Sequence, residues 1–296
     1  MIRIDVSDHE ASGPVAYMHI PKTSGASVTH ALAAAARPSL TVVGYDLCLF
    51  GSFHDFQTFD AGLLRQIYFS SADLPRNIEL VAGHFAFLTL RAAYPEARML
   101  TVLREPVSRL LSHWLYMRQQ TDETLKASGA WGDRMRYGRL SLARFLNESV
   151  LASHIDNVAV RMLLWRHPLI PCDDFISSAY DEQLLAEASD RLGEFDFVDI
   201  VENEYFASNL RQWLGRQFFE YEKLNETGDI PLEHRAPLHK ELTSEAHALL
   251  GARTRLDFKL WALVARSRIP GCAVSALRER TILANTAKYA ALMATA

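Results

Sequence analysis

The sequence has 296 residues, 49% of them hydrophobic and 22% charged, with a net charge of −4 at pH 7. This composition is typical of a globular chain with a sizeable core, and the charge argues against general coating of nucleic acid. The three cysteines, Cys48, Cys172 and Cys272, are far apart and lack metal-site spacing, which favours a reducing compartment over a disulfide framework. We see neither an apolar signal segment nor a membrane-length apolar run, so we expect a cytoplasmic protein.

A strand, a tight turn and a helix are predicted near the start of the chain. Residues 15–20 are apolar except for His19 and predict a buried strand, which Pro21 ends. Residues 26–36, rich in alanine and leucine, predict a helix. Lys22 precedes a turn of small residues, which are Thr23, Ser24, Gly25 and Ser27. This arrangement suits a phosphate at the helix start, whereas the lysine position differs from that of the nucleotide-hydrolase loop. An ordinary strand–helix connection with a surface lysine is the alternative.

Strands and helices alternate through the rest of the sequence. Further strands are predicted at 40–45, 78–82, 97–103 and 195–201, and helices at 61–70, from Pro106, from Ser141, and at 156–165, 182–192, 205–219, 243–266 and 273–296. Two long polar loops are expected at 121–140 and 222–240, the first as a mobile lid. The alternation predicts one α/β domain over 1–296, a three-layer sandwich with a mostly parallel sheet. Its core should span about 15–265, with 267–296 as a helical tail without obvious chemistry.

Three predicted strands end in residues that suit an anion site. His84 follows the strand at 78–82, and Arg104 follows the strand at 97–103. Because ligands of parallel sheets bind at the carboxyl ends of the strands, we expect Lys22, His84 and Arg104 to converge. Ser108 and Ser112 should lie on the polar stripe of the next helix and form, with Arg104, a second phosphate site. The alternative is a solvated helix face with a surface arginine.

These segments together resemble a known family. Residues 18–27, Met-His-Ile-Pro-Lys-Thr-Ser-Gly-Ala-Ser, look like the 5′-phosphosulfate loop of sulfotransferases that use 3′-phosphoadenosine 5′-phosphosulfate (PAPS). Residues 102–114 resemble the 3′-phosphate motif of their carbohydrate group, which includes the heparan-sulfate 2-O- and 6-O-sulfotransferases. Gly-His-Phe at 83–85 falls where this group places a catalytic histidine. Residues 197–206 and 256–261 resemble its later segments.

The resemblance implies a P-loop-like sulfotransferase fold and transfer of a sulfuryl group from PAPS to a hydroxyl of a carbohydrate or other small acceptor, without a metal. It implies that Lys22 stabilises the departing phosphate and that His84 is the general base. It also implies that Arg104 and Ser112 bind the 3′-phosphate. The 5′-phosphate would lie against Thr23, Ser24, Gly25, Ala26 and Ser27. The sequence departs from the family in having Ser24-Gly25-Ala26 in place of the commoner Gly-Gly-Thr, and its missing basic stripe argues against a heparin-like polymer.

Other candidates are weighed against ordinary structural roles. His19, inside an apolar strand, is predicted to be structural, and His113, adjacent to Ser112, is predicted to point away from the site. His54 and Trp131 lie in predicted loops and could contact an acceptor. A group of arginines predicts either a solvated surface or a gate for an acidic acceptor: Arg134, Arg136, Arg139 and Arg144.

Two other functions remain open at this stage. A nucleotide-dependent kinase could use the same strand–loop–helix, although we find no clear acidic magnesium ligand in the sequence. A non-catalytic nucleotide-binding relative would keep the fold as an interaction module, although the joint presence of Lys22, His84, Arg104 and Ser112 argues against it. The start of the chain and the lack of an anchor favour a prokaryotic soluble enzyme. We expect a small-molecule or glycan acceptor, whose identity the sequence does not specify. The sequence does not fix the oligomeric state.

Overall fold

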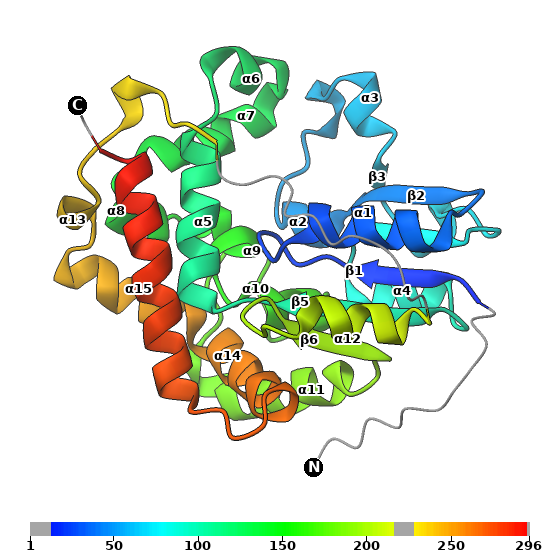
Figure 1. The fold of residues 1–296 in the computed structure, drawn as a ribbon. Helices are drawn as coiled ribbons and strands as arrows, with labels where there is room; N and C mark the ends of the chain where they lie inside the picture. The colour runs from blue at the N-terminus through cyan, green and yellow to red at the C-terminus, as the bar shows by residue number, and fades with distance from the viewer. Residues whose placement is uncertain (1–12, 216–227, 295–296) are drawn as a thin grey trace.

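A sheet of six parallel strands runs through the centre of the molecule, in the order β3-β2-β4-β1-β5-β6 (Figure 1). The computed structural model describes residues 13–215 and 228–294. The strands are β1 (Val15–Met18), β2 (Thr41–Asp46), β3 (Ile67–Tyr68), β4 (Leu80–His84), β5 (Arg98–Leu103) and β6 (Phe197–Ile200). The predicted parallel sheet is confirmed, and β1 lies at its centre between β4 and β5.

Helices cover both faces of the sheet, as the alternation of strands and helices predicts. Along β1, Val15 and Tyr17 pack toward one face, whereas Ala16 and Met18 pack toward the other, the two-residue period of a strand buried on both sides. The helices of the first face are α1 (Gly25–Ala36) and α12 (Phe206–Trp213). Those of the second face are α4 (Phe87–Ala93), α10 (Val158–Leu163), α11 (Asp181–Leu192) and α14 (Ser244–Arg268). The fold is therefore a three-layer α/β sandwich.

A helical cluster stands beyond the end of β5. Its centre is α5 (Pro106–Arg118), which starts where the Glu105 carboxylate accepts hydrogen bonds from the backbone N–H groups of Val107 and Ser108, at 3.2 and 2.7 Å. The apolar surface of α5 packs against α8 (Leu142–Leu146), α13 (Leu238–Glu241), α14 and α15 (Val274–Leu292). Figure 1 shows α15, in red, running beside α5. The predicted helical tail is therefore part of the packed structure.

Two predicted segments have a different structure. The helix predicted at 61–70 is one turn, α3 (Ala61–Leu64), followed by β3. The loop predicted at 121–140 contains α6 (Asp122–Ala127), α7 (Gly129–Met135) and a 3₁₀ turn over Arg136–Arg139. Its glycines suggest a loop. In the structure, however, they allow the α6 and α7 backbones to approach closely, because a Cβ atom on Gly132 would lie 1.9 Å from the Leu125 carbonyl oxygen.

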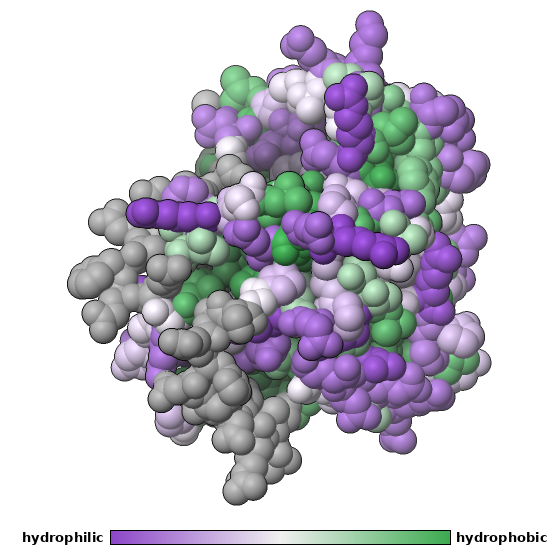
Figure 2. All heavy atoms as spheres, turned by 90° about the vertical axis from the view of Figure 1, so that its right-hand side faces the viewer, coloured by the Kyte–Doolittle hydropathy of each residue, from purple (hydrophilic) through white to green (hydrophobic). Residues whose placement is uncertain are grey.

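The remaining elements are short. They are α2 (Leu47–Phe50), α9 (Ala152–Ile155) and 3₁₀ turns at Phe56–Thr58, Ser71–Asp73, Ser149–Leu151, Ser178–Tyr180 and Leu232–His234. The ends of two predictions, residues 216–219 of a helix and 222–227 of a loop, lie outside the described residues. No helix in the described ranges has the length and apolar character that a bilayer crossing requires. Figure 2 shows the side from which the strands start, where hydrophilic side chains surround small apolar patches.

Candidate functional site

A cavity of about 990 Å³ opens at the carboxyl ends of the central strands. The loop between β1 and α1, the ends of β4 and β5 and the second half of α5 border it, together with α7, α9 and α15. The predicted site residues that line it are Lys22, Ser24, Gly25, Ala26, Ser27, His84, Arg104 and Ser112. The structure thus brings together in one cavity all but one of the residues that the strand ends and the resemblance single out.

The exception is Thr23. Its side chain is buried, and its hydroxyl donates a hydrogen bond of 2.8 Å to the Ile20 carbonyl. The expectation that the Thr23 side chain borders the phosphate is therefore not met. The hydroxyl instead fastens the turn to the end of the strand.

The turn before α1 is shaped by local backbone geometry. Lys22 and Ser24 adopt left-handed conformations, with φ of 69° and 65°, which are costly for residues other than glycine. Gly25 is required by the ring of His19, because a Cβ atom there would lie 1.8 Å from its Nε2. Ser24 makes no side-chain cap on α1, so the turn leaves backbone N–H groups at the helix start for an anion.

Lys22 is a poorly solvated cation at the edge of this turn. Burial, with a further contribution from the positive charge of Arg104, lowers its pKa to about 8. The Nζ atom lies 4.8 Å from the centroid of the Tyr116 ring and makes no ion pair with a described residue. A lysine in this environment gains electrostatically from an anionic ligand.

Arg104 is held by groups from both ends of the chain. Its Nη1 donates to the Lys22 carbonyl at 3.1 Å, and its Nη2 donates to Asn285 Oδ1 at 2.8 Å and to the Tyr289 hydroxyl at 2.9 Å. These bonds use three of the five guanidinium hydrogens, which leaves two for a ligand in the cavity. Ser112, two turns into α5, lines the cavity with Arg104, whereas the buried Ser108 does not.

Sequence reasoning missed the contribution of α15. Asn285, Lys288 and Tyr289 all line the cavity, although the tail was expected to lack obvious chemistry. The available signal was their spacing of three and four residues, which places polar and aromatic groups on one stripe of an alanine-rich helix. Their meeting with Arg104 could not be predicted, because the contact joins residues 181 and 185 positions apart.

His84 lies at the boundary between two parts of the cavity. Its Nδ1 lies 2.6 Å from the His19 carbonyl oxygen, which only accepts hydrogen bonds, so Nδ1 carries the proton and Nε2 keeps its lone pair. Burial lowers the pKa of His84 to about 4 despite this hydrogen bond, so the ring is neutral near pH 7. His19, predicted to be structural, also lines the cavity, and its ring centroid lies 4.3 Å from that of His84 with the two rings tilted by 34°.

The part of the cavity beyond His84 is uncharged and aromatic. Tyr45, Phe50 and Trp131 line it, as do His113 and His154. The prediction that His113 points away from the site is wrong: the cavity extends around α5, so that neighbouring residues of this helix both border it. Trp131 lies in α7, not in a loop, but reaches the cavity as the sequence suggested.

The other predicted acceptor contacts lie elsewhere. His54 is exposed and pairs with Asp55, at 3.7 Å. Arg134 donates to two backbone carbonyls, and Arg139 pairs with Asp122 at 2.6 Å. None of the predicted contacts His54, Arg134 and Arg139 lines the cavity. Arg136 and Arg144 are absent from the lining as well. A gate formed by this arginine group is therefore not supported.

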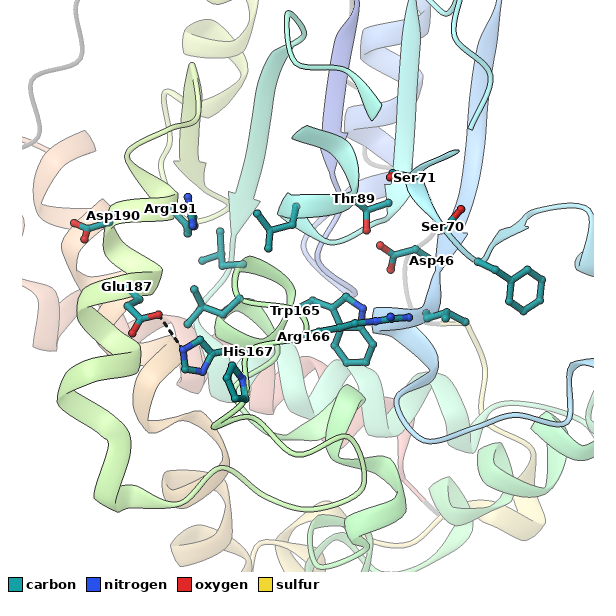
Figure 3. Close-up of a pocket in the computed structure, with 16 residues that line it drawn as sticks. Asp46, Ser70, Ser71, Thr89, Trp165, Arg166, His167, Glu187, Asp190 and Arg191 are labelled. Atoms are coloured by element: carbon teal, nitrogen blue, oxygen red, sulfur yellow. Dashed lines mark ion pairs between the residues drawn. The ribbon is translucent and has the colours of Figure 1, made fainter. Parts of the chain in front are cut away.

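A second cavity, of about 740 Å³, lies beside α4 and α11 (Figure 3). Most of its ionic groups are already matched: His167 contacts Glu187 at 3.0 Å, and Asp46 accepts from the backbone N–H groups of Cys48 and Ala86 at 2.9 and 2.8 Å. The guanidinium carbon of Arg166 lies 5.9 Å from the centroid of the Trp165 ring. This cavity therefore offers little unsatisfied chemistry to a ligand.

The residues described by the structure contain no group of three histidine, cysteine or acidic side chains placed to hold a metal ion. No protein-family model matches the sequence, and no curated protein matches it. The geometry of the cavity is consequently the main basis for a functional assignment.

Proposed function

We propose that this protein is a PAPS-dependent sulfotransferase with a P-loop-like sulfotransferase fold and a hydroxyl acceptor of carbohydrate or related type. The observation that carries the proposal is the convergence of two cationic sites in one cavity. Lys22 and the uncapped start of α1 form the first, and Arg104 with Ser112 forms the second. Two cationic groups, one at the start of α1 and one after the end of β5, suit a nucleotide with phosphates at both its 5′ and 3′ positions.

In the proposed reaction, the acceptor hydroxyl oxygen attacks the sulfur of PAPS and forms the new O–S bond. The bond between sulfur and the bridging phosphate oxygen breaks, and its electron pair leaves with 3′-phosphoadenosine 5′-phosphate. His84 Nε2, unprotonated because Nδ1 faces a carbonyl, takes the hydroxyl proton. Lys22 stabilises the charge that develops on the departing oxygen. Positioning and electrostatics supply most of the rate enhancement, as in phosphoryl transfer.

The test incubates the full chain with PAPS carrying a radioactive sulfur and a panel of hydroxyl acceptors. We expect label in an acceptor and equimolar release of 3′-phosphoadenosine 5′-phosphate. Parallel reactions contain ATP and magnesium with the same acceptors. Phosphate transfer or ATP hydrolysis there, without sulfuryl transfer from PAPS, would contradict the proposal in favour of a kinase-type enzyme.

A further inference from the structure

The cavity beyond His84 has a composition unlike that of the part around Lys22. This part is formed by the lining residues from β2, α2, α3 and α9 and from 113–135, none of which is a lysine, arginine, aspartate or glutamate. The charged lining residues are Lys22 at the boundary and, in the other part, Arg104, Glu202, Glu204 and Lys288. Aromatic and aliphatic side chains form most of its walls: Tyr45, Leu49, Phe50, Leu63, Tyr116, Met117, Trp131 and Met135. Away from Lys22, whose Nζ lies 4.8 Å from the centroid of the Tyr116 ring, a charged acceptor group placed here would lose hydration without gaining an ion pair, so this lining favours an uncharged molecule.

Two buried histidines in this lining have ring nitrogens that are available for hydrogen bonds with a ligand. His113 from α5 and His154 from α9 are only 4% and 3% exposed and stack at 5.1 Å with an interplanar angle of 8°. The His113 ring makes no hydrogen bond with the described part of the chain, and the only hydrogen-bonding contact of the His154 ring is a weak one with the Leu49 backbone. Buried polar groups normally have partners, so the unsatisfied ring nitrogens of this pair at a cavity wall indicate a ligand that supplies them.

Both imidazoles are neutral at physiological pH. Burial, then neighbouring His154 and Arg109, lowers the pKa of His113 well below its usual value. Burial, then the nearby His84, Arg109 and Arg134, lowers the pKa of His154 to about 3. A neutral imidazole has one N–H donor and one acceptor nitrogen, which matches a hydroxyl group that also donates and accepts.

Two of the other polar side chains of this part are already engaged. Gln120 Nε2 donates to the Tyr116 carbonyl at 2.8 Å, and the Ser128 hydroxyl donates to the Thr124 carbonyl at 2.9 Å. Trp131 packs against His154, with ring centroids 5.2 Å apart, and offers an apolar surface next to the pair. The available recognition chemistry is therefore hydroxyl binding beside an aromatic wall.

We infer that this part of the cavity binds the acceptor as an uncharged ring that carries hydroxyl groups, with His113 and His154 holding a hydroxyl other than the one that reacts. The inference rests on the proposed function and specifies its acceptor class. Neutral sugars and hydroxylated aromatic or alicyclic rings share this chemistry. Acceptors with carboxylate or sulfate groups near the reacting ring are disfavoured.

The test compares binding of p-nitrophenyl β-glucopyranoside and p-nitrophenyl β-glucuronide, in which a carboxylate replaces the C6 hydroxymethyl group, to the full chain with and without saturating 3′-phosphoadenosine 5′-phosphate. Calorimetry measures affinity, and the imidazole nitrogen signals of His113 report the location of the probe. We expect at least 10-fold tighter binding of the neutral glucoside and a shift of the His113 signals. Methyl β-glucopyranoside and 2-naphthol then show whether the sugar or the aromatic ring is the recognised part.

The His113→Phe variant keeps a ring and removes both nitrogens, and we expect it to weaken glucoside binding about 5- to 10-fold. His113→Asn, which restores a donor and an acceptor, should recover part of the loss, and His30→Phe on the exposed face of α1 is the matched control.

Equal or tighter binding of the glucuronide, or no binding of any neutral probe, would overturn the inference. Failure of the nucleotide itself to bind would instead contradict the proposed function, while the comparison without nucleotide still tests this part of the cavity. Since that comparison uses the natural chain, the test does not depend on the folding of a variant.

Discussion

The part of the cavity around Lys22 and the part beyond His84 are lined by different kinds of side chain. Around the β1–α1 turn, cationic side chains and backbone N–H groups border the cavity, and Lys22 has no ion-pair partner among the described residues. Beyond His84, the walls are aromatic and the polar groups are neutral. This difference suggests that the cationic part binds the anionic donor nucleotide and that the neutral part binds an uncharged hydroxyl compound. His84 lies between them.

Loss of the boundary histidine is expected to have the largest effect, because it should separate turnover from binding. In His84→Ala, we expect turnover to fall about 10²- to 10⁴-fold, the usual contribution of a general base, while binding of 3′-phosphoadenosine 5′-phosphate remains unchanged. Steady-state transfer assays and calorimetry on the same preparation measure the two quantities. His30→Ala is the control. An equal loss of binding and turnover would assign His84 to the nucleotide site.

The cationic part should depend strongly on Arg104. We expect Arg104→Ala to weaken binding of 3′-phosphoadenosine 5′-phosphate about 10- to 100-fold, since hydrogen bonds to charged groups contribute about 1.5–3 kcal/mol. Binding of neutral glycosides should be unaffected. Calorimetry with both ligands checks the separation, and Arg76→Ala at an exposed position is the matched control. If glycoside binding fell equally, the two parts would not be independent.

Nucleotide affinity should also decrease at alkaline pH. The pKa of Lys22 in the free protein is lowered to about 8, so the lysine loses its proton as pH rises above that value. Because the anion binds the protonated form, affinity should be constant below pH 8 and fall by up to about tenfold per pH unit above it. Titrations from pH 6.5 to 9.5 measure this slope.

Two variants identify the titrating group. Lys22→Met should bind the nucleotide weakly at every pH and remove the alkaline decrease. Lys259→Met, at an exposed position of α14, should keep the profile of the natural chain. An alkaline decrease that persists in Lys22→Met would show that another group titrates.

The smallest expected effect concerns the link between α15 and Arg104. Tyr289→Phe removes only the hydroxyl that accepts a hydrogen bond from Arg104, and we expect a loss of nucleotide affinity of about 2- to 10-fold, the range for one hydrogen bond. Its effect on turnover should follow binding, because Tyr289 is placed to position Arg104. A Tyr289→Phe variant with unchanged affinity would show that the ligand, not α15, fixes the guanidinium.

Local patterns in the sequence predict much of this architecture. The apolar run before Lys22, the helix from Pro106 and the residues at three strand ends place Lys22, His84 and Arg104 at one edge of the sheet, because parallel strands end together. The structure confirms that convergence. The polar stripe of Ser108 and Ser112 was expected to be solvent-facing or to form a ligand site. Ser112 lines the cavity, whereas Ser108 is buried away from it.

The remaining features depend on contacts between distant segments. Tyr289 meets Arg104 across most of the chain, and no local pattern specifies that approach. The stacking of His113 on His154 likewise requires α5 and α9 to pack together. In the segment 121–140, Gly132 suggested a loop because glycine has a low helix propensity. In the structure Gly132 is helical and packs closely against the backbone of Leu125.

The most direct test of the two-phosphate site compares 3′-phosphoadenosine 5′-phosphate with AMP, which lacks only the 3′-phosphate, by calorimetry on the natural chain. If Arg104 and Ser112 bind that phosphate, the bisphosphate should bind at least about tenfold more tightly, as charge-assisted hydrogen bonds of this kind predict. Equal affinities for the two nucleotides would contradict the assignment of Arg104 and Ser112 and, with it, the proposed use of PAPS.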